Sequence, residues 1–355
     1  MPLILRHVAT KGNSLPQVMS AKLMTSCHVQ MSAFPISRRN TSKETKDALA
    51  RCQEEITVGT NRTFTMSLRT TGYTEALKSG DVTIPGVDLQ FIEVKPQIAA
   101  FRRMVRDVEF DICELASTTY MVARGHGKPF KALPVFFNRR FHHEGILVRP
   151  DAGIIEPKDL EGKKVGVRAY SVTTGVWVRG ILQNEYGVDP FKVTWVVDDE
   201  EHVAELELPD NVVHVPEGKS LASMMAAGEI DAGLAGSAGI GREGPPTAAW
   251  EDKAAPSMDG YRQLFEDHDA LEAEWYARTG IYPCHPTIVL KDTVVAANPD
   301  LPQLVFDALV KSKSIYLEKL HAGQGTSKED QKLKRLAGIV GPDPIPYGLD
   351  RKSVV

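Results

Sequence analysis

Strand-like and helix-like patterns alternate over residues 63–119, and this alternation limits the fold more than any other feature of the sequence. Apolar and polar side chains alternate along 63–70, 87–94 and 110–114, with the two-residue period of a β-strand. Residues 96–109 instead carry apolar side chains at helical spacing. A regular order of strand and helix predicts an α/β fold with a parallel sheet.

A second α/β block is predicted further along the chain. Residues 145–149 and 287–290 read as similar edge-like strands, and they bracket a block with its own strand–helix pattern. We therefore expect two lobes, the second inserted into the first through two hinge strands, with a ligand site in the cleft between them. The expected divisions are an extension over 1–60, lobe one over 61–147 and 286–355, and lobe two over 148–285.

Two segments of lobe two carry expectations of their own. Residues 261–278 are predicted to form one amphipathic helix, because their apolar side chains recur at helical spacing. The acidic run 198–202 is interpreted as a solvated loop, because clustered carboxylates are rarely buried.

The first 43 residues contain no Asp or Glu, but six Lys or Arg and many Ser and Thr. This composition is typical of an organellar transit peptide, and a disordered tail or a mis-assigned start is the alternative. No apolar segment follows that would make it a secretory signal. We expect a cytoplasmic protein, with a mitochondrial location as the alternative.

Composition argues against several classes of protein. The net charge is −4 and no basic stripe is present, so a nucleic-acid partner is not expected. No apolar run of about 18 residues predicts a membrane span. The four cysteines form no CxxC pair, and His142 and His143, being adjacent on an extended chain, point to opposite faces. We therefore predict no metal ion, and leave a homo-oligomer open.

Residues 165–182 read as a strand, a polar turn and the start of a helix. Hydroxyl and backbone N–H groups at a helix N-terminus, with guanidinium groups nearby, are typical of an anion site. The side chains that predict such a site here are Arg168, Tyr170, Thr173, Thr174 and Arg179.

Several motifs resemble the 4,5-dihydroxyphthalate decarboxylase family, whose members share the type II periplasmic-binding-protein fold. They are AYSVTTGVWVRGIL at 169–182, EYGV at 185–188, GEIDAGL at 228–234, TGIYPCHPTIVL at 279–290, and Arg139-x-Phe141-x-His143. The resemblance covers about residues 63–345. It implies removal of one carboxylate from a dihydroxylated aromatic dicarboxylate as CO2, without an organic cofactor.

The residue roles follow from what this chemistry requires. A proton must reach the ring carbon, a phenol must share its proton, and the carboxylates must be held. We predict His285 or His143 as the proton donor and Glu114 as the group that takes the phenol proton. The predicted substrate-binding residues are Arg69, Tyr73, Ser117, Thr118, Arg139, Arg168, Tyr170, Thr173, Thr174 and Arg179.

Two other functions are compatible with the same fold. A solute-binding protein for a small aromatic or other carboxylate would bind without catalysis, although no export signal is evident. An enzyme of thiamine-pyrimidine synthesis is the second alternative, and it resembles the chain less well because no run of clustered cysteines is present.

Overall fold

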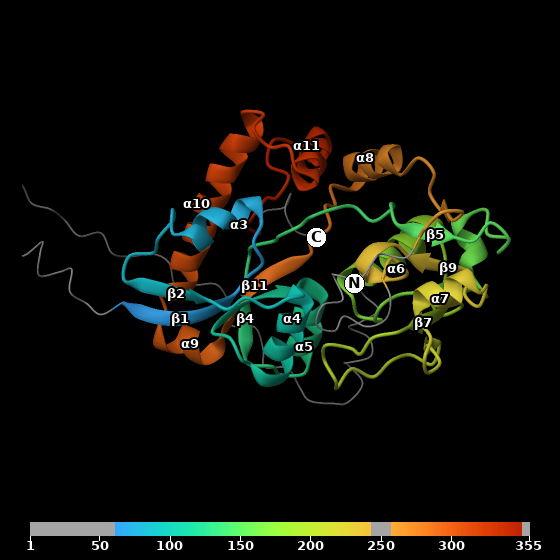
Figure 1. Cartoon of the computed structure of the whole chain (residues 1–355), viewed down its shortest axis with the longest axis horizontal. Helices are drawn as coiled ribbons and strands as arrows, with labels where there is room; N and C mark the ends of the chain where they lie inside the picture. Colours follow the sequence, from blue (N-terminus) through green and yellow to red (C-terminus); the bar gives the residue numbers. More distant parts are fainter. Residues whose placement is uncertain (1–60, 243–256, 350–355) are drawn as a thin grey trace, which may run out of the picture. The chain divides into compact units, whose positions relative to one another are not determined.

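The computed structural model describes residues 61–242 and 257–349. The extension predicted over residues 1–60 lies outside these residues. By its contacts the chain divides into the units Met1–Arg62 and Thr63–Val355. Apart from the first residue of β1, every element described below belongs to the second unit (Figure 1).

The first sheet has five strands in the order β2-β1-β3-β11-β4. Strand β1 pairs parallel with β3, whereas β11 pairs antiparallel with both β3 and β4. The bounds are β1 (Arg62–Ser67), β2 (Val87–Phe91), β3 (Ile112–Ala116), β4 (Phe130–Leu133) and β11 (Pro286–Lys291).

Six helices accompany the first sheet among the described residues. Helix α10 packs against α3, and α4 packs against β3 (Figure 1). Apolar side chains of α3, α10 and α11 join those of the strands in one buried cluster that includes Met66, Ile112 and Leu309. The bounds are α3 (Gly72–Ser79), α4 (Gln97–Asp107), α5 (Ser117–Gly125), α9 (Asp292–Ala297), α10 (Leu301–His321) and α11 (Lys328–Val340).

The second sheet has six strands in the order β10-β5-β9-β6-β7-β8. Strand β6 pairs parallel with β7 and β9, and β5 pairs antiparallel with β9 and β10. The bounds are β5 (Ile146–Val148), β6 (Lys164–Gly166), β7 (Thr194–Val197), β8 (Val212–His214), β9 (Ala232–Leu234) and β10 (Arg262–Gln263).

Apolar clusters cover both faces of the second sheet. Trp195 and Val197 of β7 belong to one cluster and Val196 to the other, as the two-residue period of a strand requires. The accompanying helices are η1 (Pro157–Leu160), α6 (Thr173–Tyr186), α7 (Leu221–Ala226), η2 (Gly236–Ala238) and α8 (His268–Thr279).

Helix α6 is formed by a clear local pattern. Its buried residues Val178 and Leu182 are four positions apart, so they share one face of the helix and join the apolar cluster around Trp195. Ile181 belongs to the apolar cluster of the first sheet instead. Gly187 ends it in the left-handed region at φ 65°, and its N–H donates to the carbonyl of Leu182.

The predicted α/β fold class is confirmed, because two mixed sheets are connected in the predicted manner. All strands of the second sheet lie between Ile146 and Gln263, inside the interval that separates β4 from β11. The expectation of a wholly parallel sheet was wrong. Strand β11 returns from the second sheet and enters the first between β3 and β4 from the opposite end.

The single helix predicted over 261–278 was wrong at its start. Arg262 and Gln263 pair instead with β5, and α8 begins only after Asp267, whose side chain accepts from the N–H of Ala270 at 3.3 Å. A carboxylate at this position caps the helix and fixes where it can start. Residue boundaries of the lobes stay a prediction, although β5, at the predicted 147/148 boundary, belongs to the second sheet.

Candidate active site

The starts of α5 and α6 meet where the two sheets' helices approach each other. The hydroxyl of Thr118 lies 2.8 Å from that of Thr173 and donates to the carbonyl of Ser171 at 2.7 Å. The hydroxyl and the N–H of Ser117 both donate to the carbonyl of His285. These predicted binding residues are therefore brought together, but their hydrogen bonds join the two lobes to each other.

A buried pair of imidazoles lies beside this junction. The Nε2 atoms of His142 and His285 are 2.7 Å apart, so one ring carries the proton and the other accepts it. Trp177 of α6 lies parallel to the ring of His142, with centroids 6.4 Å apart. Its indole N–H donates to the carbonyl of Cys284 at 3.0 Å. Chain segments from both lobes thus fix the orientation of the pair.

Burial and positive neighbours keep both rings neutral. Burial, followed by the charge of Arg140, lowers the pKa of His142 and of His285 well below the usual value. Lys332 lowers both as well, and Arg69 adds to the effect on His285. The pair therefore lies in a positively charged region.

Arg140 is the cation of this region that sequence reasoning missed. Within the described part of the chain, its guanidinium makes one hydrogen bond, to the hydroxyl of Thr174 at 3.0 Å, and no ion pair. Burial lowers its pKa, and the charges of Glu329 and Glu144 offset part of this effect. The one signal in the sequence was the Arg-Arg pair before Phe141, whose members must point in different directions.

Its neighbour Arg139 is packed among groups of the protein. The side chain is fully buried, donates to the carbonyl of Tyr282 at 3.0 Å, and lies over the rings of Phe136 and Tyr282. Tyr73 is buried likewise and stacks on Phe137 in the core of the first lobe. These are the contacts of side chains packed in a core.

Arg69 and Glu114 form an ion pair near this region. The Nε of Arg69 lies 2.6 Å from a carboxylate oxygen of Glu114, and its backbone N–H donates to the other oxygen at 3.2 Å. Glu114 is fully buried in the middle of β3, whereas Arg69 is one-third exposed. The charge of Arg69 is felt at His285 and Arg140.

His143 does not join the other imidazoles. It packs edge-on against Phe265 and Trp275, and burial lowers its pKa to about 4. His142 and His143 therefore face different surroundings, as adjacent extended residues should. The structure brings His142, which the sequence interpretation did not select, into contact with His285.

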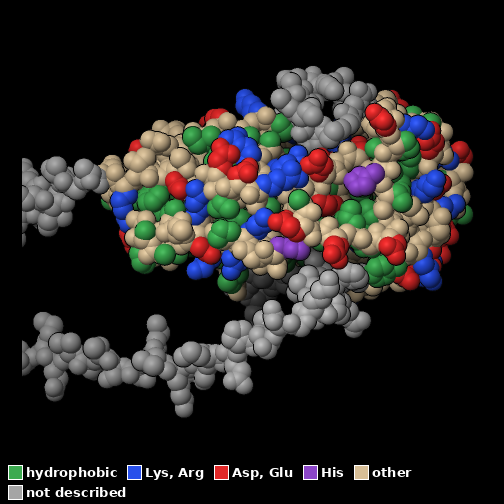
Figure 2. All heavy atoms as spheres, turned by 90° about the horizontal axis from the view of Figure 1, so that it is seen from below, with side chains coloured by type: hydrophobic (Ala, Val, Ile, Leu, Met, Phe, Trp, Pro, Cys, Tyr) green, Lys and Arg blue, Asp and Glu red, His purple; other side chains and the backbone are tan. Residues whose placement is uncertain are grey.

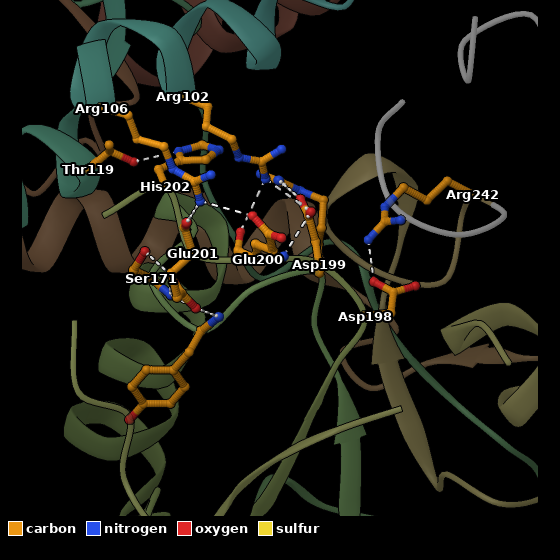
Figure 3. A network of polar contacts seen from close by, with 12 residues as sticks. Arg102, Arg106, Thr119, Ser171, Asp198, Asp199, Glu200, Glu201, His202 and Arg242 are labelled. Atoms are coloured by element: carbon orange, nitrogen blue, oxygen red, sulfur yellow. Dashed lines mark hydrogen bonds and ion pairs between the residues drawn. The ribbon is translucent and has the colours of Figure 1, made fainter. Parts of the chain in front are cut away.

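The anion site predicted at the start of α6 is already filled by a carboxylate of the chain. Glu201 accepts from the backbone N–H groups of Tyr170 and Ser171, and also from the hydroxyl of Ser171 (Figure 3). Val172 is the N-cap, and Thr173 is already helical, so neither threonine caps the helix with its side chain. The motif was predicted to bind an anion. In the structure, the carboxylate of Glu201 accepts the hydrogen bonds of its N–H and hydroxyl groups.

Arg168 and Arg179 likewise have partners within the protein. The guanidinium of Arg168 donates to Asp199 at 2.8 Å, and both side chains are buried. Arg179 lies over the ring of Tyr170 at 3.8 Å and donates to its carbonyl at 2.6 Å. Both arginines brace the second lobe in this structure.

The acidic run 198–202 is not the solvated loop that its composition indicated. Asp198, Asp199 and His202 are buried, and the run bonds to the helices of the first lobe (Figure 3). Arg102 of α4 lies 3.1 Å from Asp199, and Arg106 lies 2.9 Å from Glu200. Carboxylates can be buried here because each has a cation or backbone N–H as its partner.

One cluster has the residue types of a cation site. His268, Asp269 and Glu272 place ligand atoms within 4.8 Å of one another. Arg335 bonds to both carboxylates, so the positive charge at this place comes from its guanidinium. The cluster is explained by this ion-pair network.

Charged side chains of both signs are interspersed over the face shown in Figure 2. Among residues 61–242 and 257–349, none of the helices combines the length and apolar character that a membrane span requires.

Comparison with known proteins gave relatives in sequence and in fold. The family described as NMT1/THI5 like matches residues 83–213. A 4,5-dihydroxyphthalate decarboxylase from Comamonas testosteroni is 36% identical over 292 residues, which are 79% of this chain and 84% of the relative. A protein of the same name from Pseudomonas putida is 36% identical over 208 residues, 56% of this chain and 76% of the relative.

Solved structures with a similar arrangement are more distant. The periplasmic aliphatic sulphonate binding protein SsuA from Escherichia coli is 12% identical, with a TM-score of 0.46, over 80% of each chain.

Proposed function

Because the chain belongs to the 4,5-dihydroxyphthalate decarboxylase family, we propose that it removes one carboxylate from a dihydroxylated aromatic dicarboxylate as CO2. With 4,5-dihydroxyphthalate as substrate, the aromatic product is protocatechuate. The observation that carries the proposal is the 36% identity, which extends over most of both chains.

The surroundings of Arg140 support a dicarboxylate as the substrate. A guanidinium that makes no ion pair among the described residues offers paired N–H donors of the geometry that a carboxylate accepts. Lys332 is the second cation acting on the imidazole pair, and its own pKa is lowered by burial. We propose that Arg140 holds one ring carboxylate, with the hydroxyl of Thr174 beside it.

The imidazole pair is the group best placed to supply the proton. When the bond between the ring and the carboxylate breaks, its electron pair stays on the ring, and a proton must reach that carbon. We assign this step to His285, held by His142. The ion pair of Arg69 and Glu114 is the proposed partner of the phenol hydroxyls, because a carboxylate can accept a phenol hydrogen bond. For His143 the contacts do not support a role as donor.

Incubation of the purified protein with 4,5-dihydroxyphthalate tests the proposal. We expect protocatechuate and CO2 in equal amounts, measured by liquid chromatography and by CO2 release. Phthalate, which lacks the hydroxyl groups, is the control: it should bind without losing CO2, because its ring is less able to accept the proton. Tight binding of 4,5-dihydroxyphthalate without any product would instead favour the alternative, a solute-binding protein.

A further inference from the structure

The His142–His285 pair is unusual because charges of one sign dominate around it. Arg140 and Lys332 act on both rings, Arg69 acts on His285, and His143 lowers the pKa of His142 further. The nearby carboxylates interact with these cations and not with the imidazole rings. Glu114 pairs with Arg69, Glu329 lies 3.7 Å from Lys332, and Glu329 and Glu144 act on Arg140.

We propose that the His142–His285 pair takes up one proton when an anionic ring carboxylate binds against Arg140, and that this proton replaces CO2 on the ring. The inference rests on the proposed function. It makes His142 a positioning residue, which acts on the ring carbon through His285.

The hydrogen bond between the rings explains why the pair can hold an added proton. In the neutral pair, one Nε2–H already donates to the bare Nε2 of the other ring at 2.7 Å. Protonation of the donor ring turns this contact into a charge-assisted hydrogen bond, which is stronger than a neutral one. The two rings then titrate as a unit, and the acquired charge is shared between two buried groups.

Substrate binding supplies the driving force for the uptake. In the empty site, burial and the cations oppose a charge on the rings. A carboxylate at Arg140 cancels part of that positive field and adds a negative charge near the rings, which favours their protonated form. The pair is thus neutral without substrate and protonated with it, so that the acid is formed where the anion is held.

The proton and electrons balance in the step that follows. The bond from ring carbon to carboxylate breaks, CO2 leaves, and the electron pair remains on the ring. Because Nε2 of His285 faces His142, the Nδ1–H bond of the His285 imidazolium breaks, and a C–H bond forms at the same ring carbon. The pair returns to the neutral state, and the next carboxylate recruits a new proton from solvent.

Isothermal titration of phthalate into the full chain at pH 7.5 measures the uptake. The observed enthalpy is recorded in buffers of different ionisation enthalpy, and the slope gives the number of protons bound. We expect about one proton per phthalate in the native protein and a slope near zero in His142→Gln and His285→Gln. The control His214→Gln, at an exposed residue of β8, should behave like the native protein.

A second measurement needs no variant. If binding is linked to uptake of a proton, the Kd for phthalate in the native protein rises by up to tenfold per pH unit above neutrality. A pH-independent Kd, a slope of zero in the native protein, an unchanged slope in His142→Gln, or absence of phthalate binding would each contradict the inference.

The decarboxylation assay separates this inference from the proposed function. Turnover of 4,5-dihydroxyphthalate without proton uptake on phthalate binding removes the role of the imidazole pair and leaves the function standing. Proton uptake without turnover removes the proposed function, and the delivery step with it.

Discussion

At the scale of single residues, the arginines differ in the partners that the protein gives them. Arg139, Arg168 and Arg179 have carbonyls, aromatic rings or carboxylates of the protein as partners. Arg140 has only the Thr174 hydroxyl within the described residues. An arginine with few hydrogen-bond and ion-pair partners in the protein is the most available to a ligand. Substitution of Arg140 should therefore have a different effect from substitution of the other three arginines.

Arg140→Gln is expected to lower kcat/KM for 4,5-dihydroxyphthalate by about ten- to a hundredfold. A hydrogen bond to a charged group contributes about 1.5–3 kcal/mol, and glutamine keeps the polarity while removing the charge. Steady-state kinetics on the purified variant measures this. Arg103→Gln, whose arginine pairs with Glu109 on the first lobe, is the matched control. Equal kinetics in the two variants would exclude Arg140 from the binding site.

His143 should make the fold sensitive to acid. Its pKa is about 4 in the folded protein, below the ordinary value of 6.5. The unfolded chain therefore binds more protons between these values, and stability is lost as pH falls from about 6.5 to 4, by up to about 3 kcal/mol. In His143→Gln, the free energy of unfolding in urea should fall less between pH 7 and pH 5. A decrease as large as in the native protein would contradict this assignment.

At the scale of elements, the start of α6 depends on a residue distant in the sequence. Glu201, in the segment after β7, accepts the N–H groups of Tyr170 and Ser171, and this turn leads directly into the helix. A negative charge at a helix N-terminus is also favoured by the helix dipole. The sequence-local threonines do not provide this cap.

Glu201→Ala is therefore expected to destabilise the protein by about 1–3 kcal/mol, because two backbone donors lose their acceptor. Thermal unfolding followed by circular dichroism would show a lower Tm. The adjacent exposed Glu200 pairs with Arg106 at the surface, and Glu200→Ala should change stability by less than about 1 kcal/mol. If both variants unfolded alike, the capping role would be excluded.

At the scale of the whole molecule, the two lobes are joined by more than one set of contacts. Arg102 and Arg106 of α4 contact the acidic run after β7, while Thr118 of α5 contacts the start of α6. These contacts hold the helix starts together beside the imidazole pair. Self-association and the cellular location stay predictions.

Substitution of both Arg102 and Arg106 by Gln is expected to raise KM several-fold with a smaller change in kcat. The arrangement of the two lobes that completes the site would be less populated, whereas the proposed catalytic groups, His142 and His285, are retained. Steady-state kinetics with 4,5-dihydroxyphthalate measures the two constants, and Arg103→Gln on the same helix is again the control. A fall in kcat alone would contradict a role in bringing the lobes together.

The sequence by itself determined the fold class and the family. The two-residue and helical periods are local properties of the chain, and they specify strands and helices in an order that few folds share. The motifs at 169–182 and 279–290 indicated the family for the same reason, because the spacing of residues within a short motif can be recognised in the sequence itself. Thr118 was selected because it was expected to begin a helix, and His285 because it lies beside the predicted hinge strand 287–290.

Only the tertiary structure decided which partner each polar group has. The sequence indicated an anion-binding turn at 170–171. The carboxylate that binds there belongs to Glu201, which is 30 positions from Ser171 in the sequence. The pairing of His142 with His285 joins residues 143 positions apart. Hydrogen bonds and ion pairs form between whatever groups the packed chain brings within about 3 Å, and the packing of both lobes sets that distance. Arg140 differs from Arg139 for this reason: the fold gives Arg139 a carbonyl acceptor and two aromatic rings, and gives Arg140 the hydroxyl of Thr174.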